Sequence, residues 1–328
     1  REHKHHRAMA VYTEISDSQL AEFLQGYNIG TVVSCKGIAE GVENSNFLLF
    51  TDKGPFILTL YEKRVEARDL PFFLSLMEHL ATEGVPCPTP IHSIDGEVLR
   101  SLCDKPAAIT SFLSGVSPQT PNLTHCENVG TALANLHLKG HTFKEYRKNS
   151  LSKEGWNKLF LQVGNRADEI ETGLSKLIQT EISYLKRFWP AELPHGVIHA
   201  DLFPDNVFFE GNKLTGLIDF YFACNDFLAY DLAICINAWC FEKDFSFNEY
   251  KARTMLRAYY RKRKMNQTEL NALPILVRGA ALRFLATRLY DWLNIVDGAL
   301  VKPKDPIEYV NKLRFHQSIK SENIYTIQ

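Results

Sequence analysis

The chain has no surplus of charge of either sign and little glycine or proline. Its 328 residues include 37 lysines and arginines against 38 aspartates and glutamates, a net charge of −1, with 18 glycines and 14 prolines. Proteins that bind along nucleic acids usually carry a basic excess, and disordered or collagen-like chains show high net charge or a large share of glycine and proline. The composition therefore indicates a folded protein and argues against nucleic acid as a partner.

Paired cysteines and long apolar runs are also missing. Seven cysteines lie scattered without a C-x-x-C spacing, so we expect reduced thiols and a cytoplasmic protein. The apolar run 227–236 is interrupted by Asp231 and is shorter than the roughly 18 residues of a membrane-spanning helix, so no membrane partner is expected. No signal peptide is recognisable, and residues 1–8, basic and rich in histidine, are expected to be a leader or the remnant of an expression tag.

The predicted secondary structure changes near Ser114, from rich in strands to mainly helical. Before it, the sequence predicts a helix from Ser16, a hairpin of 46–51 and 55–61, a helix over 69–80, and strands at 97–99 and 107–112. After it, the sequence predicts helices over 125–137 and 169–188, short strands and turns over 196–219, and helices again from Tyr230. We therefore expect an α+β protein with a small β-rich lobe over 9–113 and a larger, mainly helical lobe over 114–328. A cleft between two such lobes is a common place for a small ligand.

The segment 197–209 carries the strongest chemical signal. It reads Val-Ile-His-Ala-Asp-Leu-Phe-Pro-Asp-Asn-Val-Phe-Phe and fits H-x-D-x-x-x-x-N, the catalytic loop of phosphoryl transfer. In that loop the aspartate, here Asp201, accepts the proton of the attacking hydroxyl, and the asparagine, here Asn206, binds a metal ion. Pro204 stiffens the chain between them.

A single carboxylate follows at the end of a short apolar strand. Residues 214–220 form this predicted strand after the turn at 210–212, and its pairing with the catalytic loop would bring Asp219 beside Asn206. Both side chains offer oxygen, the ligand that Mg²⁺ prefers. Taken singly, Asp201 could cap a helix and Asp219 could be a turn residue, but the order of loop, strand and carboxylate favours the catalytic interpretation.

These segments resemble the aminoglycoside phosphotransferase and choline kinase superfamily. The resemblance rests on residues 107–115, 130–137, 199–206 and 216–219, and implies a bilobal, protein-kinase-like fold. Within that superfamily, residues 57–63, 197–203, 216–226 and 283–292 are most similar to the bacterial homoserine kinases. The resemblance implies ATP-dependent phosphorylation of the side-chain hydroxyl of L-homoserine in threonine biosynthesis.

The resemblance also implies roles for individual residues. Asp201 would be the catalytic base, Asn206 and Asp219 the Mg²⁺ ligands, and His199 a support of the loop. The linker would lie along the adenine of ATP through Thr110, Ser111, Phe112 and Leu113. The loop that begins at Gly37 and ends at Gly41 would lie near the phosphates, although its sequence is equally consistent with a plain turn. Thr59 stands where the superfamily often has a phosphate-binding lysine, so Lys63 or Lys36 is expected to replace that cation.

The acceptor pocket is less clearly marked. Homoserine carries an ammonium and a carboxylate, which call for an acidic group and for an arginine fork respectively. Asp205 and Asp226 are candidates for the acidic group, Arg283 and Arg288 for the fork, and Tyr221 for a further contact. Structural readings stay open, because Asp226 could cap a helix, Tyr221 could be core, and Arg288 could pair with Asp291.

Two other functions remain open from the sequence. The same fold could phosphorylate another small alcohol, such as an aminoglycoside, choline or methylthioribose, and an inactive nucleotide-binding module would explain Thr59. Small molecules and ATP with Mg²⁺ are the expected partners, in a monomer or a homodimer.

Overall fold

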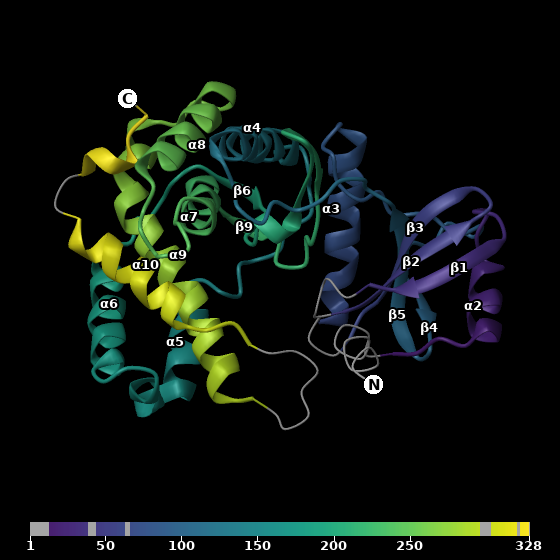
Figure 1. Ribbon diagram of the computed structural model, residues 1–328, viewed down its shortest axis with the longest axis horizontal. Coiled ribbons are helices and arrows are strands. Elements are labelled where there is room, and N and C mark those ends of the chain that lie inside the picture. The colour runs from purple at the N-terminus through teal and green to yellow at the C-terminus, as the bar shows by residue number, and fades with distance from the viewer. Residues whose placement is uncertain (1–12, 39–43, 63–65, 296–302, 320–321, 328) are drawn as a thin grey trace. The chain divides into compact units, whose positions relative to one another are not determined.

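The structure is a computed structural model that describes residues 13–38, 44–62, 66–295, 303–319 and 322–327. The chain divides into two compact units, the first extending to Ser114 and the second beginning at Gly115 (Figure 1). The expected α+β class is confirmed, because the first unit is rich in strands and the second is mainly helical.

The first unit is built on a five-stranded antiparallel sheet with the strand order β1-β2-β3-β5-β4. Its elements are α2 (Asp17–Leu24), β1 (Val32–Gly37), β2 (Ser45–Thr51), β3 (Gly54–Leu60), the 3₁₀ helix η1 (Ala67–Asp69), α3 (Leu70–Thr82), β4 (Arg100–Leu102) and β5 (Lys105–Ser111).

Alternation along the strands explains how this sheet buries one face. In β2, Phe47 and Leu49 are buried whereas Phe50 is exposed, since successive side chains point to opposite faces. The buried side chains form one apolar cluster with those of α2, which lies against the sheet in Figure 1. Ser16 and Gln19 form a capping box that starts this helix. The predicted hairpin of β2 and β3 is confirmed.

One predicted strand was wrong in position. The strand expected at 97–99 is instead β4, at Arg100–Leu102. Leu102 pairs with Lys105, which leaves a two-residue turn of Cys103 and Asp104, both with positive φ, 54° and 59°. Such turns fix the register of a hairpin, so the strand begins where the turn places it and not where the apolar residues fall.

The second unit contains four strands, three 3₁₀ helices and seven α-helices among the described residues. They are α4 (Leu123–Gly140), α5 (Lys153–Val163), η2 (Gly164–Glu169), α6 (Leu174–Phe188), β6 (His195–Ile198), η3 (Pro204–Asn206), β7 (Val207–Glu210), β8 (Lys213–Leu217), β9 (Cys224–Phe227), α7 (Leu228–Trp239), α8 (Glu249–Lys262), α9 (Gln267–Leu293), α10 (Ile307–Ser318) and η4 (Glu322–Tyr325).

Helix α7 forms the centre of this unit. All but one of its twelve residues are buried, and it packs against α9, α8, α4 and β6. Helix α4 lies along α8, and α9 also contacts α5 and α10 (Figure 1). Helix α9 is long and apolar enough to cross a membrane by length and composition, but 67% of its apolar window is buried inside the protein, as in a core helix.

The boundaries of two other elements differ from the sequence predictions. The helix expected over 169–188 begins only at Leu174, because Gly173 adopts a left-handed φ of 87° that separates it from η2. The strand expected over 214–220 ends at Leu217, and Asp219 takes a φ of 62°. Helix α5 and strand β9 were not predicted.

Candidate active site

Two small antiparallel sheets of two strands each hold the catalytic loop. Strand β6 leads into the loop and pairs with β9, whereas β7 leads out of it and pairs with β8. Pro204 begins the 3₁₀ helix η3 between them, at a helical position where a missing N–H costs nothing. The loop is therefore anchored at both ends by strand pairing.

Asp201 and Asn206 are joined directly. The side-chain Nδ2 of Asn206 donates to the backbone oxygen of Asp201 at 2.8 Å and to its carboxylate Oδ2 at 3.3 Å. The amide oxygen of Asn206 has no hydrogen-bond partner among the described residues and faces away from these two bonds. An amide oxygen without a partner suits a hard cation such as Mg²⁺.

Asp219 is brought beside this pair by the backbone. The N–H of Ile218 donates to the carbonyl of Asn206 at 2.9 Å, so the next residue along the chain, Asp219, lies at the same end of the β7–β8 hairpin. Among the residues that the structure describes, no group of three or more His, Cys, Asp or Glu side chains forms a ready metal site. A cation here would therefore rely on Asn206, Asp219 and oxygens from a ligand, which is how Mg²⁺ is usually held with phosphates.

His199 connects the two halves of the loop. Its Nε2 donates to the carbonyl of Ile218 at 2.8 Å, and its Nδ1 accepts the N–H of Asp201 at 3.1 Å. Burial lowers the pKa of this fully buried histidine, although the charge of Asp231 raises it, which favours the neutral ring that these two bonds require.

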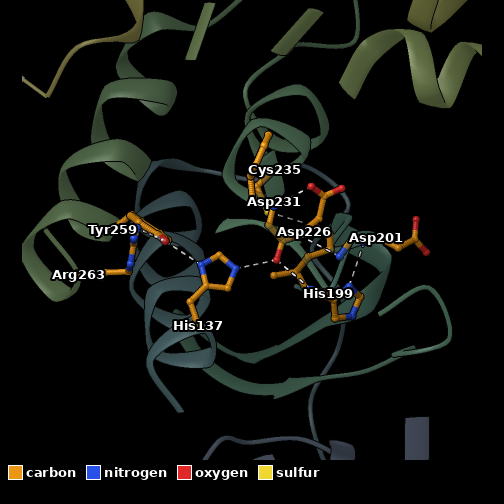
Figure 2. Close-up of polar contacts among 11 residues, drawn as sticks. His137, His199, Asp201, Asp226, Asp231, Cys235, Tyr259 and Arg263 are labelled. Carbon is orange, nitrogen blue, oxygen red and sulfur yellow. Dashed lines mark hydrogen bonds and ion pairs between the residues drawn. The ribbon is translucent and has the colours of Figure 1, made fainter. Parts of the chain in front are cut away.

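Asp231 is a site residue that the sequence analysis missed. From helix α7 its Oδ2 accepts the N–H of His199 at 2.9 Å and Nε2 of His137 at 2.8 Å, and its Oδ1 accepts the N–H of Ala200 at 2.9 Å (Figure 2). Burial alone would raise the pKa of this carboxyl, but hydrogen bonds and charge from His137 lower it below its usual value. The sequence did contain a sign of this role, because Asp231 is the one carboxylate inside the apolar run 227–236.

The acceptor-site candidates lie in different surroundings. Asp205 is exposed, with its carboxylate 4.0 Å from Lys304. Asp226 is largely buried, accepts Nδ2 of Asn149 at 2.8 Å and its neighbour's N–H, and has a pKa raised by burial. Tyr221 is half-buried and lies two residues after Asp219 in the chain.

The two arginines of α9 also differ. Arg288 forms an ion pair with Glu308 at 3.1 Å, and not with Asp291. Arg283 is 5% exposed and its guanidinium carbon lies 3.8 Å from the ring centre of Phe284, which packs at 4.9 Å against Phe203, so the structure brings Arg283 to the catalytic loop.

The nucleotide candidates belong to the first unit. Thr110 and Ser111 end β5, where Ser111 exchanges backbone and side-chain hydrogen bonds with Thr89. Phe112 and Leu113 follow, Phe112 being 41% exposed. Gly37 ends β1. Gly41 and Lys63 lie outside the described residues, as does the segment 1–8.

Thr59 is part of the sheet and not an open position. It is buried in β3 and donates to Oδ1 of Asn46 at 2.8 Å. Lys36 is exposed on β1. Of the two lysines expected to replace the phosphate-binding lysine, Lys36 is therefore the one that lies within the described residues.

Comparison with known proteins gives a consistent picture. Residues 34–265 match the phosphotransferase enzyme family. Homoserine kinase of Bradyrhizobium sp. (strain BTAi1) is 61% identical over 317 residues, covering 97% of both chains. Homoserine kinase of Rhodospirillum rubrum is 58% identical over 317 residues, covering 97% of this chain and 99% of the relative.

Solved structures with the same fold are far less similar in sequence. Amicoumacin kinase in complex with AMP-PNP, Ca²⁺ and its ligand superposes with a TM-score of 0.66 at 14% identity, over 95% of both chains. Choline kinase of Cryptosporidium parvum superposes with a TM-score of 0.60 at 16% identity, over 92% of this chain and 94% of the other.

Proposed function

This chain belongs to the phosphotransferase enzyme family and, within it, to the homoserine kinases, and on that premise we propose that it transfers the γ-phosphoryl group of ATP to the side-chain hydroxyl of L-homoserine. The product is O-phospho-L-homoserine, which places the enzyme in threonine biosynthesis, with the cytoplasm as its compartment.

The observation that carries the chemistry is the bonded unit of Asp201 and Asn206. An amide that donates to Asp201 holds its carboxylate in one orientation while presenting its own oxygen on the other side. Phosphoryl transfer needs such a pair, because one group must orient the attacking hydroxyl while the other binds the cation of the nucleotide.

In the mechanism that follows, Asp201 accepts the hydroxyl proton of homoserine as the oxygen forms its bond to the γ-phosphorus. The bond from that phosphorus to the bridging oxygen breaks, and ADP leaves. Asn206 and Asp219 would hold Mg²⁺, which would neutralise charge on the phosphate oxygens. Asp231 and His199 hold the backbone of the loop, so that Asp201 does not have to reorganise during the reaction. ATP binds along Thr110 to Leu113.

A coupled assay of ADP release tests the function. Purified protein with Mg²⁺ and ATP is expected to turn over L-homoserine and to leave an aminoglycoside, choline and methylthioribose unchanged. Asp201→Asn should lower kcat roughly 10²- to 10⁴-fold, the range typical of a lost general base. Asp95→Asn, an exposed aspartate of the first unit, is the matched control and should keep full activity.

The other outcomes identify the rival functions. Turnover of another alcohol in place of homoserine would mean a different acceptor on the same fold. Binding of ATP without turnover of any acceptor would mean an inactive nucleotide-binding module.

A further inference from the structure

Helix α9 offers two arginines for the carboxylate of the acceptor, and their surroundings separate them. This inference rests on the proposed function and concerns the same site. Arg288 already has its counter-charge, because its guanidinium lies 3.1 Å from Glu308 and over the ring of Tyr309 at 4.4 Å. Lys312 shares the same carboxylate of Glu308 at 3.1 Å. Arg288 therefore belongs to an ion-pair cluster with Glu308 and Lys312, which connects α9 to α10.

Arg283 has no such ion pair among the described residues. It is 5% exposed, and it forms no hydrogen bond or ion pair with any residue that the structure describes. A guanidinium has five N–H donors, and a buried charge without a partner is costly. A charge in this position therefore indicates a ligand that supplies the acceptors.

Aromatic rings hold Arg283 in place from its sides. Its guanidinium carbon lies 3.8 Å from the ring centre of Phe284 and 5.3 Å from that of Phe222. Cation–π contacts stabilise the charge over a ring face but leave the in-plane N–H groups unsatisfied. Those N–H groups are the ones that bind a carboxylate in a bidentate manner.

Two buried hydroxyls of the same unit are also unsatisfied. The hydroxyls of Tyr230 and Tyr309 have no hydrogen-bond partner among the described residues. The ring of Tyr309 lies 5.5 Å from that of Phe284, the ring next to the guanidinium of Arg283, and it also faces Arg288. Unsatisfied buried groups are rare in folded proteins, so a free hydroxyl beside this part of α9 supports a polar ligand there.

Arg283 also lies near the reacting end of the site. The ring of Phe284, which its guanidinium covers, lies 4.9 Å from the ring of Phe203, two residues after Asp201 in the catalytic loop. The hydroxyl of homoserine is separated from the carboxylate by three carbon atoms, so a molecule whose hydroxyl meets Asp201 needs its carboxylate partner in the immediate surroundings of the loop.

We propose that Arg283 binds the α-carboxylate of the acceptor and thereby selects amino acids over simple amino alcohols. Arg288 has a structural role in this assignment. The selection arises because a buried guanidinium left without an anion disfavours an acceptor that lacks one.

The test compares two acceptors that differ only in the carboxylate. L-Homoserine has it, and 3-aminopropan-1-ol keeps the hydroxyl and the amine without it. Arg283→Met should lower kcat/KM for L-homoserine roughly 10- to 100-fold, the range expected for charged hydrogen bonds, and should raise kcat/KM for 3-aminopropan-1-ol, because that acceptor no longer leaves a buried charge unpaired. L-2-Aminobutyrate, which keeps the carboxylate and lacks the hydroxyl, should lose its competitive inhibition by the same factor.

Two further variants sharpen the result. Arg283→Lys keeps the charge without the planar fork, so it should retain part of the preference for homoserine and also serves if the methionine variant does not fold. Arg288→Met should lower the melting temperature without changing the ratio between the two acceptors.

Three results would overturn the assignment: an equal loss for both acceptors in Arg283→Met, unchanged kinetics with L-homoserine in that variant, or a selective loss in Arg288→Met. A wild-type enzyme that does not phosphorylate L-homoserine would overturn the proposed function itself, so the two failures are distinguishable.

Discussion

At the scale of single residues, the site depends on a carboxylate that does not touch the reaction. Ala200 adopts a φ of 68°, a left-handed conformation that costs energy for a residue with a side chain. The bond from its N–H to Asp231 holds this conformation, while the bond from His199 fixes the preceding peptide. Strain at the catalytic loop is thus offset by one buried side chain of α7.

Replacing Asp231 by asparagine tests this positioning role. An asparagine has one acceptor oxygen in place of two and adds an N–H₂ group facing donors, so one of the three donors loses its partner. We expect kcat to fall at least 10-fold with little change in the KM for ATP, and the free energy of unfolding to fall by roughly 3 kcal/mol. Steady-state kinetics and urea denaturation measure the two effects.

Tyr259→Phe is the control for the Asp231 variant. Tyr259 bonds to Nδ1 of His137 at 2.7 Å, one step further from the loop. Its loss should cost about 1 kcal/mol of stability and leave kcat within twofold. Full activity in Asp231→Asn would contradict the role of this carboxylate.

At the scale of elements, the close approach of α4 and α8 sets the position of His137. A methyl group added to Gly130 in α4 would lie 2.4 Å from the backbone oxygen of Met255 in α8, which is closer than any real contact. A backbone atom cannot rotate away, so the helices would have to separate. Glycine is therefore required here by packing, despite its low helix propensity.

Gly130→Ala should destabilise the second unit by roughly 2 kcal/mol or more, in the range of overpacked cores. The matched control is Gly140→Ala at the other end of the same helix, where the added methyl group would meet Cβ of Val197 at an ordinary 3.5 Å. That change should be neutral or stabilising by up to about 1 kcal/mol, since alanine favours helix. Equal melting temperatures for the two variants would show that α4 and α8 can separate without cost.

At the scale of the whole molecule, a buried histidine connects the C-terminal segments to the central helix. His316 of α10 bonds to Oδ1 of Asn237 in α7 and to the hydroxyl of Tyr325, both at 2.6 Å. Burial lowers its pKa to about 3, with smaller effects in the same direction from the charges of Arg278 and Lys312. The folded protein therefore holds this ring neutral.

The sign of the resulting pH dependence follows from the two states. The unfolded chain protonates His316 below about pH 6.5, whereas the folded chain does not until about pH 3. Stability from this group is complete above pH 6.5 and should fall by about 1.4 kcal/mol per pH unit as the pH decreases below it. The tryptophans, at 156, 189, 239 and 292, all lie in the second unit, so their fluorescence reports its unfolding in urea.

His316→Gln removes the titrating group and keeps a polar side chain. Its free energy of unfolding should depend less steeply on pH between 6.5 and 4.5, with other histidines whose pKa burial also lowers, His199 and His125, still contributing to the slope. A wild-type stability that is constant across this range would contradict the neutral state of His316.

Much of the site was predictable because its residues are close in the sequence. Asp201 and Asn206 belong to one loop, and the turn at 210–212 returns the chain at once to Asp219, so local spacing determines their proximity. Asp231 and Arg283 reach the loop from α7 and α9, elements remote in the chain, and their partners depend on helix packing. No local pattern distinguishes Arg283 from Arg288, five residues later on the same helix.

The sequence by itself determined the class of fold, the catalytic loop and the order of its strands, because periodicity, turns and motif spacing act over a few residues. The tertiary structure decided which charges have partners. It paired Arg288 with Glu308 and left Arg283 buried without an ion pair or hydrogen bond to any described residue. Pairing of charges depends on which helices meet, and that is set by packing of the whole unit.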